Sequence, residues 1–143
     1  MKKSSIIAFV VLVLAILGLI ARKSFFARGW LAIAVQIAAI LLMVWARLTF
    51  GIRSFHAAAN PTKGGLITKG PYRFVRHPIY AAVIYFVWAG ALSHLSLINI
   101  CLAIVIVVAF AVRITAEERL LVEIYPEYLA YSSRTKRIIP FLF

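Results

Sequence analysis

The chain has 143 residues, and its composition excludes an ordinary water-soluble domain. Apolar residues make up 64% of it, the mean hydropathy is +1.00, and the apolar residues form long blocks with charges gathered between them. Sixteen Lys and Arg face four acidic residues, which gives a net charge of +12. Because the basic residues sit at the ends of apolar blocks, they indicate a membrane protein in contact with lipid headgroups, and no nucleic-acid partner is expected. The composition predicts an all-α integral membrane protein with a single domain, residues 1–143.

The first apolar block runs from Ile6 to Ala21 and has basic residues on both sides. At 1.5 Å per residue, such a 6–21 span reaches only about 24 Å, which predicts snorkelling lysines or local thinning of the bilayer. A cleavable signal peptide is the alternative, since it also needs a basic start and a short apolar stretch. We favour a membrane span because no clean small-x-small cleavage site precedes the basic segment from Arg22 to Arg28.

The second block, residues 30–50, has 21 residues and is long enough to cross about 30 Å of hydrocarbon. Trp30 and Trp45 lie near its two ends, as interfacial anchors do. Arg47 lies in its last turn, and two interpretations stay open. Its guanidinium either snorkels to the cytoplasmic headgroups or joins the candidate site described below.

The third block, from Pro78 to Val112, has 35 residues without a charge. One straight helix of that length would measure about 52 Å, which is too long for a single crossing. The block must therefore fold back, and its one polar cluster predicts where: Ser93, His94, Ser96 and Asn99. Spans at about 79–93 and 97–113 then form a tight hairpin, which brings the expected total to four transmembrane helices.

The tail, residues 114–143, is a mixed and partly amphipathic segment. Pro126 interrupts it, because proline lacks the amide hydrogen that a helix interior needs. We expect the helix of the fourth span to end near Tyr125 and a short second helix to carry Pro126 in its first turn, where the missing amide does no harm.

Four spans place both termini on one side of the membrane. Basic residues are concentrated on that side, in the N-terminal lysines, the connection 51–78 and the tail, whereas the other side carries only Arg22, Lys23 and Arg28. The excess predicts that both termini, the connection and the tail are cytoplasmic, at the inner membrane if the cell is prokaryotic.

Most polar residues capable of chemistry lie on this predicted cytoplasmic side, in the connection and at the start of the tail. The connection is long for so small a protein, and its glycines and prolines favour tight turns and close backbone approach to a ligand. No metal site is predicted, because His56 and His94 lack a second ligand at metal spacing and Cys101 stands alone in an apolar block.

One stretch, GGLITKGPYRFVRHPIY, is more specific. Its Gly70-Pro71-Tyr72 and Arg76-His77-Pro78-x-Tyr80 are followed some forty residues later by Glu117-Glu118 and a Tyr-rich segment that ends in Ile139-Pro140. This combination resembles the isoprenylcysteine carboxyl methyltransferase family and its prokaryotic relatives, which share features with phospholipid methyltransferases. The resemblance covers about residues 47–143. It implies a transmembrane methyltransferase that takes its methyl group from S-adenosylmethionine at the cytoplasmic interface and acts on a lipophilic or prenylated acceptor.

The resemblance also implies roles for individual residues. Arg113 corresponds to the catalytic arginine that engages the acceptor's carboxylate. The residues expected to line the cofactor pocket are Gly64, Gly65, Leu66, Ile67, Tyr72, His77, Pro78, Ile79, Tyr80 and Glu117. The residue types suit these roles, since Glu117 can accept hydrogen bonds from the cofactor, tyrosine rings can face adenine or a sulfonium, and a guanidinium can grip a carboxylate.

Each of these residues also has a structural interpretation. Arg113 and Glu117 are four apart on a predicted helix and could form a surface ion pair. His77-Pro78 could simply begin the third span, and Tyr72 and Tyr80 could be interfacial belt residues.

Two other functions stay open at this stage. One is a non-catalytic membrane scaffold whose connection binds anionic lipid or a partner through Arg53, Lys63 and Lys69. The other is a lipid reductase of similar architecture, although the sequence has no dinucleotide fingerprint. The sequence leaves the methyl acceptor, the oligomeric state and the role of Glu118 open.

Overall fold

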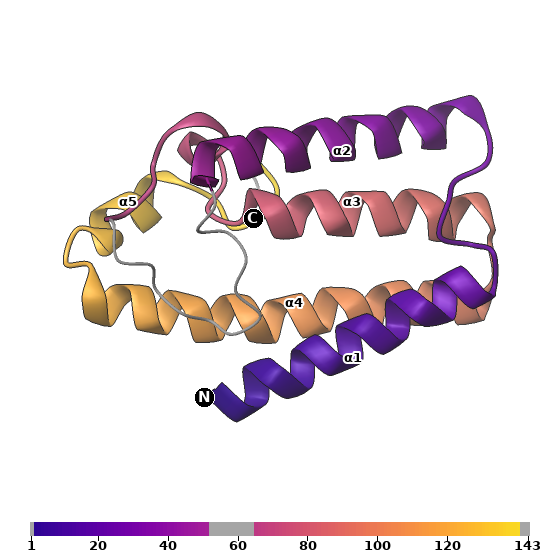
Figure 1. Cartoon of the computed structure of the whole chain (residues 1–143), viewed down its shortest axis with the longest axis horizontal. Coiled ribbons are helices and arrows are strands. Elements are labelled where there is room, and N and C mark those ends of the chain that lie inside the picture. Colours follow the sequence, from indigo (N-terminus) through magenta and orange to yellow (C-terminus); the bar gives the residue numbers. More distant parts are fainter. Residues whose placement is uncertain (1, 52–64, 141–143) are drawn as a thin grey trace.

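The computed structural model of the protein describes residues 2–51 and 65–140, and the regular elements within these ranges are helices (Figure 1). The predicted all-α class is confirmed. The elements are α1 (Lys2–Ala21), α2 (Trp30–Phe50), a 3-10 turn η2 (Gly70–Arg73), α3 (Pro78–Ser93), α4 (Leu97–Ile124) and α5 (Tyr128–Arg134).

The four long helices lie in the order α2, α3, α4, α1 (Figure 1). Helix α3 occupies the middle and packs on α2 at one side and on α4 at the other, while α1 crosses α4 obliquely. Small buried residues let the backbones of α3 and its neighbours approach closely, as in membrane helix pairs. Those in α3 are Ala81, Ala82, Ala89, Gly90 and Ala91.

Helix α1 presents a regular stripe to α4. The stripe consists of Ser5, Ala8, Leu12, Ala15 and Leu19, all buried and spaced three or four residues apart. This spacing keeps side chains on one helix face, and the opposite face of α1 is exposed apolar surface.

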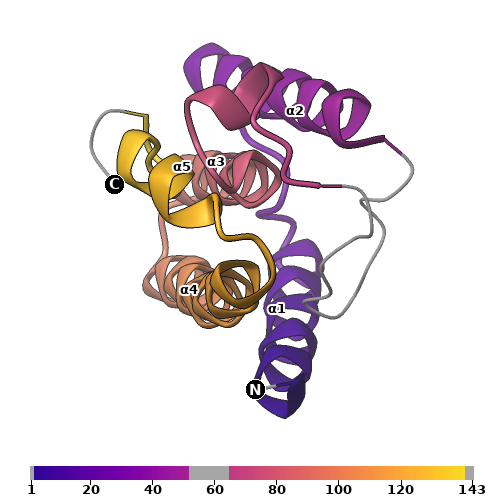
Figure 2. The same ribbon diagram turned by 90° about the vertical axis from the view of Figure 1, so that its left-hand side faces the viewer.

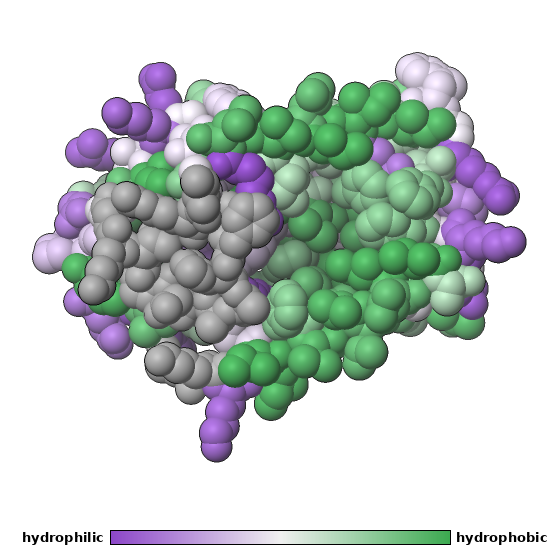
Figure 3. All heavy atoms as spheres, viewed as in Figure 1, coloured by the Kyte–Doolittle hydropathy of each residue, from purple (hydrophilic) through white to green (hydrophobic). Residues whose placement is uncertain are grey.

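Three described helices, α1, α2 and α4, are long and apolar enough to cross a membrane, and α3 is a shorter apolar helix of 16 residues. The space-filling view shows an apolar band over the helices with hydrophilic residues toward both ends (Figure 3). Helix α1 begins at Lys2, four residues before the predicted start at Ile6. With 20 residues it is about 30 Å long, but this length includes Lys2 and Lys3, so the choice between snorkelling lysines and local thinning stays a prediction.

The polar cluster inside the third apolar block does mark a turn. Helix α3 ends at Ser93, and α4 begins at Leu97. Asn99 is 2% exposed, and its amide nitrogen donates to the Ser24 hydroxyl (2.9 Å) and to the His94 carbonyl (2.6 Å). Its amide oxygen accepts from Arg22 Nε at 2.7 Å. Asn99 thereby joins the hairpin to the segment that follows α1.

Gln36 fixes the connection between α1 and α2. Its buried side-chain nitrogen donates to the carbonyls of Phe25 (2.8 Å) and Phe86 (3.0 Å), and its oxygen accepts from the Ala27 amide (2.9 Å). The connection passes so close to α3 that a Cβ added at Gly90 would lie 2.4 Å from the Phe25 carbonyl oxygen.

The C-terminal tail returns to the start of α3. Val75 and Lys136 form an isolated parallel bridge, in which the Arg76 amide donates to the Lys136 carbonyl at 2.7 Å and the Lys136 amide donates to the Phe74 carbonyl at 3.4 Å. Next to the bridge, the His77 amide donates to the Arg137 carbonyl at 3.1 Å. Viewed from the end, α5 lies in front of α3, and the end of α4 is seen below it (Figure 2). Helix α4 ends at Ile124, close to the predicted Tyr125, but Pro126 lies in a turn before α5 and not within its first turn as we expected.

Candidate functional site

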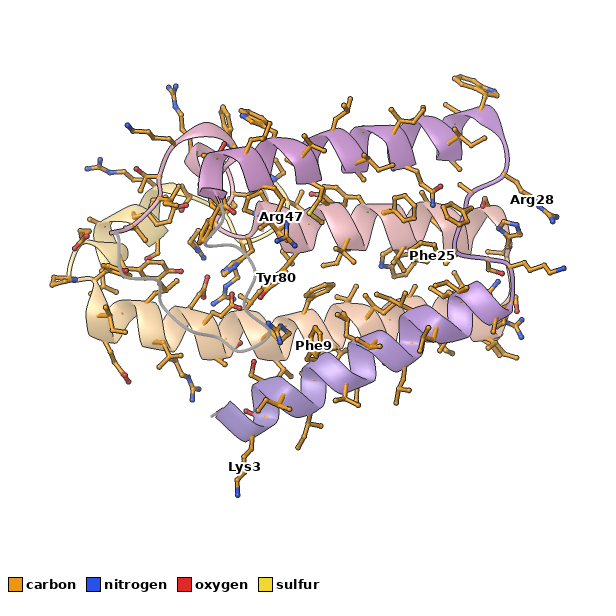
Figure 4. The ribbon with its side chains drawn as sticks, viewed as in Figure 1. Lys3, Phe9, Phe25, Arg28, Arg47 and Tyr80 are labelled. Atoms are coloured by element: carbon orange, nitrogen blue, oxygen red, sulfur yellow. The ribbon has the colours of Figure 1, made fainter. Side chains whose placement is uncertain are left out.

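Four residues predicted from the sequence converge where α3 begins and the apolar part of α4 ends. His77 caps α3 and Tyr80 lies in its first turn, next to Pro78, whose fixed φ suits the first helical position. Arg113 and Glu117 are one turn apart on α4, and so share a face of that helix. Figure 4 shows the Tyr80 side chain in the region between α3 and α4.

The carboxylate of Glu117 is the centre of this cluster. The Tyr80 hydroxyl donates a hydrogen bond to Glu117 Oε1, and Arg113 Nη2 lies 3.8 Å from the same oxygen. His77 Nδ1 is 3.6 Å from Glu117 Oε2. The rings of His77 and Tyr80 are parallel within 4°, with centroids 5.7 Å apart. The side chains thus surround one carboxylate with a phenol, an imidazole and a guanidinium.

Arg113 is a buried cation, only 4% exposed. Its Nη1 donates to the Ser5 carbonyl at 3.4 Å, and its Cζ lies 5.4 Å from the Phe9 ring centroid and 5.8 Å from that of Tyr80. Burial on this scale rules out the exposed surface ion pair that the sequence left open. Ser5 and Phe9 on α1 were not predicted as neighbours, because the sequence does not reveal which helix α1 packs against.

Glu118 has a different set of partners. Its Oε1 accepts from Arg76 Nε at 2.9 Å, and its Oε2 accepts from Arg137 Nη2 at 2.9 Å. His77 Nε2 lies 3.4 Å from Oε1. Glu118 therefore joins α4 to both the segment before α3 and the tail. In the sequence, Arg76 is only a motif position and Arg137 only one of several basic residues in the tail, so their ionic contacts with Glu118 were not predicted.

Tyr72 lies beside the cluster, buried in η2. Its ring centroid is 5.6 Å from that of Phe50, and its carbonyl accepts from the Tyr131 hydroxyl at 2.6 Å. Burial raises the pKa of the Tyr72 phenol, and the positive charge of Arg47 acts in the opposite direction. Figure 4 shows Arg47 turned inward from the end of α2, toward the region that holds Tyr80. This orientation favours the site over simple snorkelling for Arg47.

The other predicted pocket residues are not drawn into the cluster. Gly64 lies outside the described residues. Gly65 has a φ of +83°, which glycine adopts easily, and Leu66 and Ile67 are half-buried in the extended segment that follows. Within the described segment, no hydrogen bond or ring contact joins these residues to His77 or Glu117. Pro78 is buried and Ile79 half-buried, where they begin α3.

Comparison with known proteins identifies relatives. Residues 25–128 match the phospholipid methyltransferase family, a range that includes α2, α3, α4 and all four residues of the Glu117 cluster. Two curated proteins are similar to part of the chain. The cobalt-zinc-cadmium resistance protein CzcN of Cupriavidus metallidurans is 31% identical over 76 residues, which cover 52% of this chain and 35% of CzcN. The nickel-cobalt-cadmium resistance protein NccN of Alcaligenes xylosoxydans xylosoxydans is 35% identical over 80 residues, which cover 52% of this chain and 36% of NccN.

The chain therefore spans little more than a third of the length of these two relatives. No solved structure matches it. The family match covers well over half of the chain and supports the broader of the two resemblances found in the sequence, the phospholipid one. On this match, the chain belongs to the phospholipid methyltransferase family, a family of membrane methyltransferases.

Proposed function

We propose that this protein is a membrane methyltransferase that takes a methyl group from S-adenosylmethionine and passes it to a lipophilic acceptor. The acceptor group is a carboxylate, as in isoprenylcysteine carboxyl methyltransferases. The observation that carries the proposal is the convergence of His77, Tyr80 and Arg113 on Glu117, within the segment that matches the family.

The residues present fit the proposed cofactor. S-adenosylmethionine carries an adenine ring, ribose hydroxyls, a sulfonium and an amino-acid group. Glu117 can still accept a hydrogen bond from a hydroxyl or amino group of the cofactor. Its side chain is 22% exposed, and the distance of 3.6 Å from Oε2 to His77 Nδ1 is longer than a hydrogen bond. The Tyr80 ring already lies against His77, Phe110 and Arg113, and Tyr72 is 6% exposed, so adenine or the sulfonium would reach a ring face only after these side chains shift. When bound, the cofactor supplies an electrophilic methyl group.

The protein's own part in such a reaction is alignment and exclusion of water. Methyl transfer is an in-line displacement, so the reacting groups need correct orientation more than covalent help. The hydrogen bond from Tyr80 orients the Glu117 carboxylate. Arg113, with aromatic rings at 5.4 and 5.8 Å, has a planar guanidinium that can hold an acceptor's carboxylate by two parallel hydrogen bonds. Because Arg113 is buried, that interaction is screened little by water or salt.

We place this end of the bundle in the cytoplasm. Lys3, Arg47, η2 and the tail carry basic residues here, whereas the opposite end has Arg22, Lys23 and Arg28 among the described residues. Cytoplasmic segments of membrane proteins carry the excess of Lys and Arg, and this orientation would give a cytoplasmic cofactor direct access to Glu117.

Titration calorimetry tests the proposal. The purified protein in detergent should bind S-adenosylmethionine and its demethylated product, and Glu117→Gln should weaken binding at least about tenfold, the loss of one charged hydrogen bond. His77→Ala should also weaken it. Glu123→Gln is the matched control, because Glu123 is an exposed residue of the same helix and lies outside the cluster. A folded, unmutated protein that binds neither compound would overturn the proposal.

A second assay separates cofactor binding from acceptor recognition. Arg113→Gln should abolish transfer of a labelled methyl group to extracted lipid or protein but weaken cofactor binding less than Glu117→Gln does, since the guanidinium would hold the acceptor's carboxylate directly and lies 3.8 Å from Glu117 Oε1. The scaffold alternative predicts instead that replacing Arg53, Lys63 and Lys69 weakens association with anionic lipid or a partner protein, while Glu117→Ala does not. Arg53 and Lys63 lie outside the described residues. A lipid reductase would bind nicotinamide and not the methyl donor.

A further inference from the structure

A groove of about 390 Å³ lies between α1 and α4, away from the Glu117 cluster. It opens where the N-terminal end of α1 stands apart from α4 (Figure 1). The groove is lined by Ser4 of α1 and by Val108, Ala111, Val112, Thr115, Ala116 and Arg119 of α4. Most of these α4 residues lie on the face turned away from Arg113 and Glu117, whereas Ala116 adjoins Glu117 along the helix.

The floor of the groove is apolar. Val108 and Val112 are 57% and 40% exposed, so they have not been covered by another part of the described chain. Ala111 between them has a small side chain, which makes the hollow. Thr115 donates its hydroxyl to the Ala111 carbonyl of its own helix at 2.9 Å, a bond that leaves no hydroxyl proton for the groove. A hydrocarbon chain would therefore meet matching surface along about two turns of α4.

The groove ends at a cation. Arg119 follows Val112 by seven residues on the same face of α4 and is exposed. Within the described parts of the chain, Arg119 makes no hydrogen bond or ion pair, and no acidic residue lines the groove. It lies beyond the uncharged stretch of α4, which ends at Val112, and so at the depth where lipid phosphates are found.

We propose that this groove is a binding site for one anionic phospholipid. An acyl chain lies along Val108, Ala111 and Val112, and the headgroup phosphate accepts hydrogen bonds from Arg119. An anionic headgroup is favoured over a zwitterionic one, which would bring its own cation next to the guanidinium. The site contacts α1 and α4 together, so the bound lipid stabilises their packing. This inference is argued separately from the methyltransferase proposal, because none of His77, Tyr80, Arg113 and Glu117 lines the groove.

Native mass spectrometry of the purified protein measures the proposed binding. With equal amounts of phosphatidylglycerol and phosphatidylcholine, the unmutated protein should retain phosphatidylglycerol preferentially as a single adduct. Arg119→Ala should weaken retention about fivefold, the effect of one basic residue at an anionic headgroup. Lys3→Ala is the matched control, because it removes one charge at the same end of the bundle from a side chain that points away from α4 (Figure 4).

A second variant tests the apolar floor without changing charge. Ala111→Phe fills the hollow, and because Ala111 is exposed the fold should be retained, as circular dichroism would verify. We expect Ala111→Phe to reduce the phosphatidylglycerol adduct as much as Arg119→Ala does. Two results would overturn the proposal: no preference for phosphatidylglycerol in the unmutated protein, or equal small losses for Arg119→Ala and Lys3→Ala with no effect of Ala111→Phe. The second result would mean that the basic residues attract anionic lipid only through their summed positive charge, without a specific site.

Discussion

Glu117 and Glu118 are neighbours in sequence, but their carboxylates face different parts of the molecule. Successive residues on a helix point about 100° apart. Glu117 therefore meets Tyr80 and Arg113, while Glu118 meets Arg76 and the tail. His77 lies between them, with one ring nitrogen near each carboxylate. The doublet thus combines a residue suited to ligand binding with one that holds the surrounding backbone in place.

Replacing Glu118 should destabilise the fold more than it changes chemistry. Glu118→Gln removes the charge that Arg76 and Arg137 share, and we expect the free energy of unfolding to fall by about 1–3 kcal/mol. Thermal unfolding in detergent would measure the change, with Glu123→Gln as the exposed control on the same helix. Equal midpoints for the two variants would contradict this role.

Tyr131 should make stability depend on alkaline pH. Burial raises its pKa to about 12, while in the unfolded chain the phenol ionises near its usual value of about 10. The stabilisation is complete below about pH 10 and is lost as the pH rises through about 12, because the unfolded state loses its proton first. Tyr131→Phe also loses the bond to the Tyr72 carbonyl, worth about 1 kcal/mol. Between about pH 9 and about pH 11, the unfolding midpoint of Tyr131→Phe should fall less than that of the unmutated protein. If the two midpoints fell in parallel with pH, Tyr131 would not be the source of the alkaline destabilisation.

At this scale, the motif residues were predictable and their surroundings were not. The topology expected from the charge pattern already placed His77, Tyr80, Arg113 and Glu117 on one side, and the structure brings them into contact. The role of each in binding stays a prediction. The partners of Arg113 on α1 and of Glu118 in the tail depend on the tilt of one helix and the return of a strand-like segment, which local sequence does not encode.

The central helix α3 packs against a long helix on each side. It is short for a membrane span, and most of its buried residues are small, so close packing with α2 and α4 compensates for its length. The packing is tightest at Gly90. A Cβ added there would lie 2.4 Å from the Phe25 carbonyl oxygen and 2.7 Å from the Ser24 carbonyl oxygen. Backbone atoms held by Gln36 cannot move aside easily.

Gly90→Ala should therefore destabilise the bundle although alanine is the better helix former. We expect a loss of about 1–3 kcal/mol in the free energy of unfolding, typical of overpacking. Gly18→Ala is the matched control in α1, where the added Cβ would lie 3.2 Å from Leu102 Cδ1, an atom of a flexible side chain. Thermal unfolding of both variants measures the difference in stability. A Gly90→Ala protein as stable as Gly18→Ala would show that the connection between α1 and α2 moves aside to accommodate the added Cβ.

The helical elements were largely predictable because length limits are strict in a bilayer. An apolar block of 35 residues cannot cross once, and its polar cluster marks the turn that the structure contains between Ser93 and Leu97. The order of packing was not predictable, since apolar stripes on α1 and α4 match many possible partners. The position of Pro126 outside α5 also escaped prediction, because proline is as common in turns as in a first helical turn.

Over the whole molecule, the basic residues divide unevenly between the two ends of the bundle, and the orientation that we propose can be tested directly. Arg28→Cys and Arg134→Cys place a thiol at either end, each in a chain with the exposed Cys101 replaced by alanine. A membrane-impermeant maleimide should label Arg28→Cys in intact cells and Arg134→Cys only in inverted vesicles. The reverse pattern would invert the topology and place Glu117 away from a cytoplasmic methyl donor.

The order of the helices in space has a consequence for biosynthesis. Helix α1 packs mainly against α4, the last of the long helices to be made. During translation α1 must therefore wait in the bilayer with lipid on the face that Leu12 and Leu19 later bury, while α2 and α3 can already associate. A nascent chain arrested before Leu97 would hold α1 without its partner, so the surroundings of Arg113 are complete only after α4 has been made and has met α1.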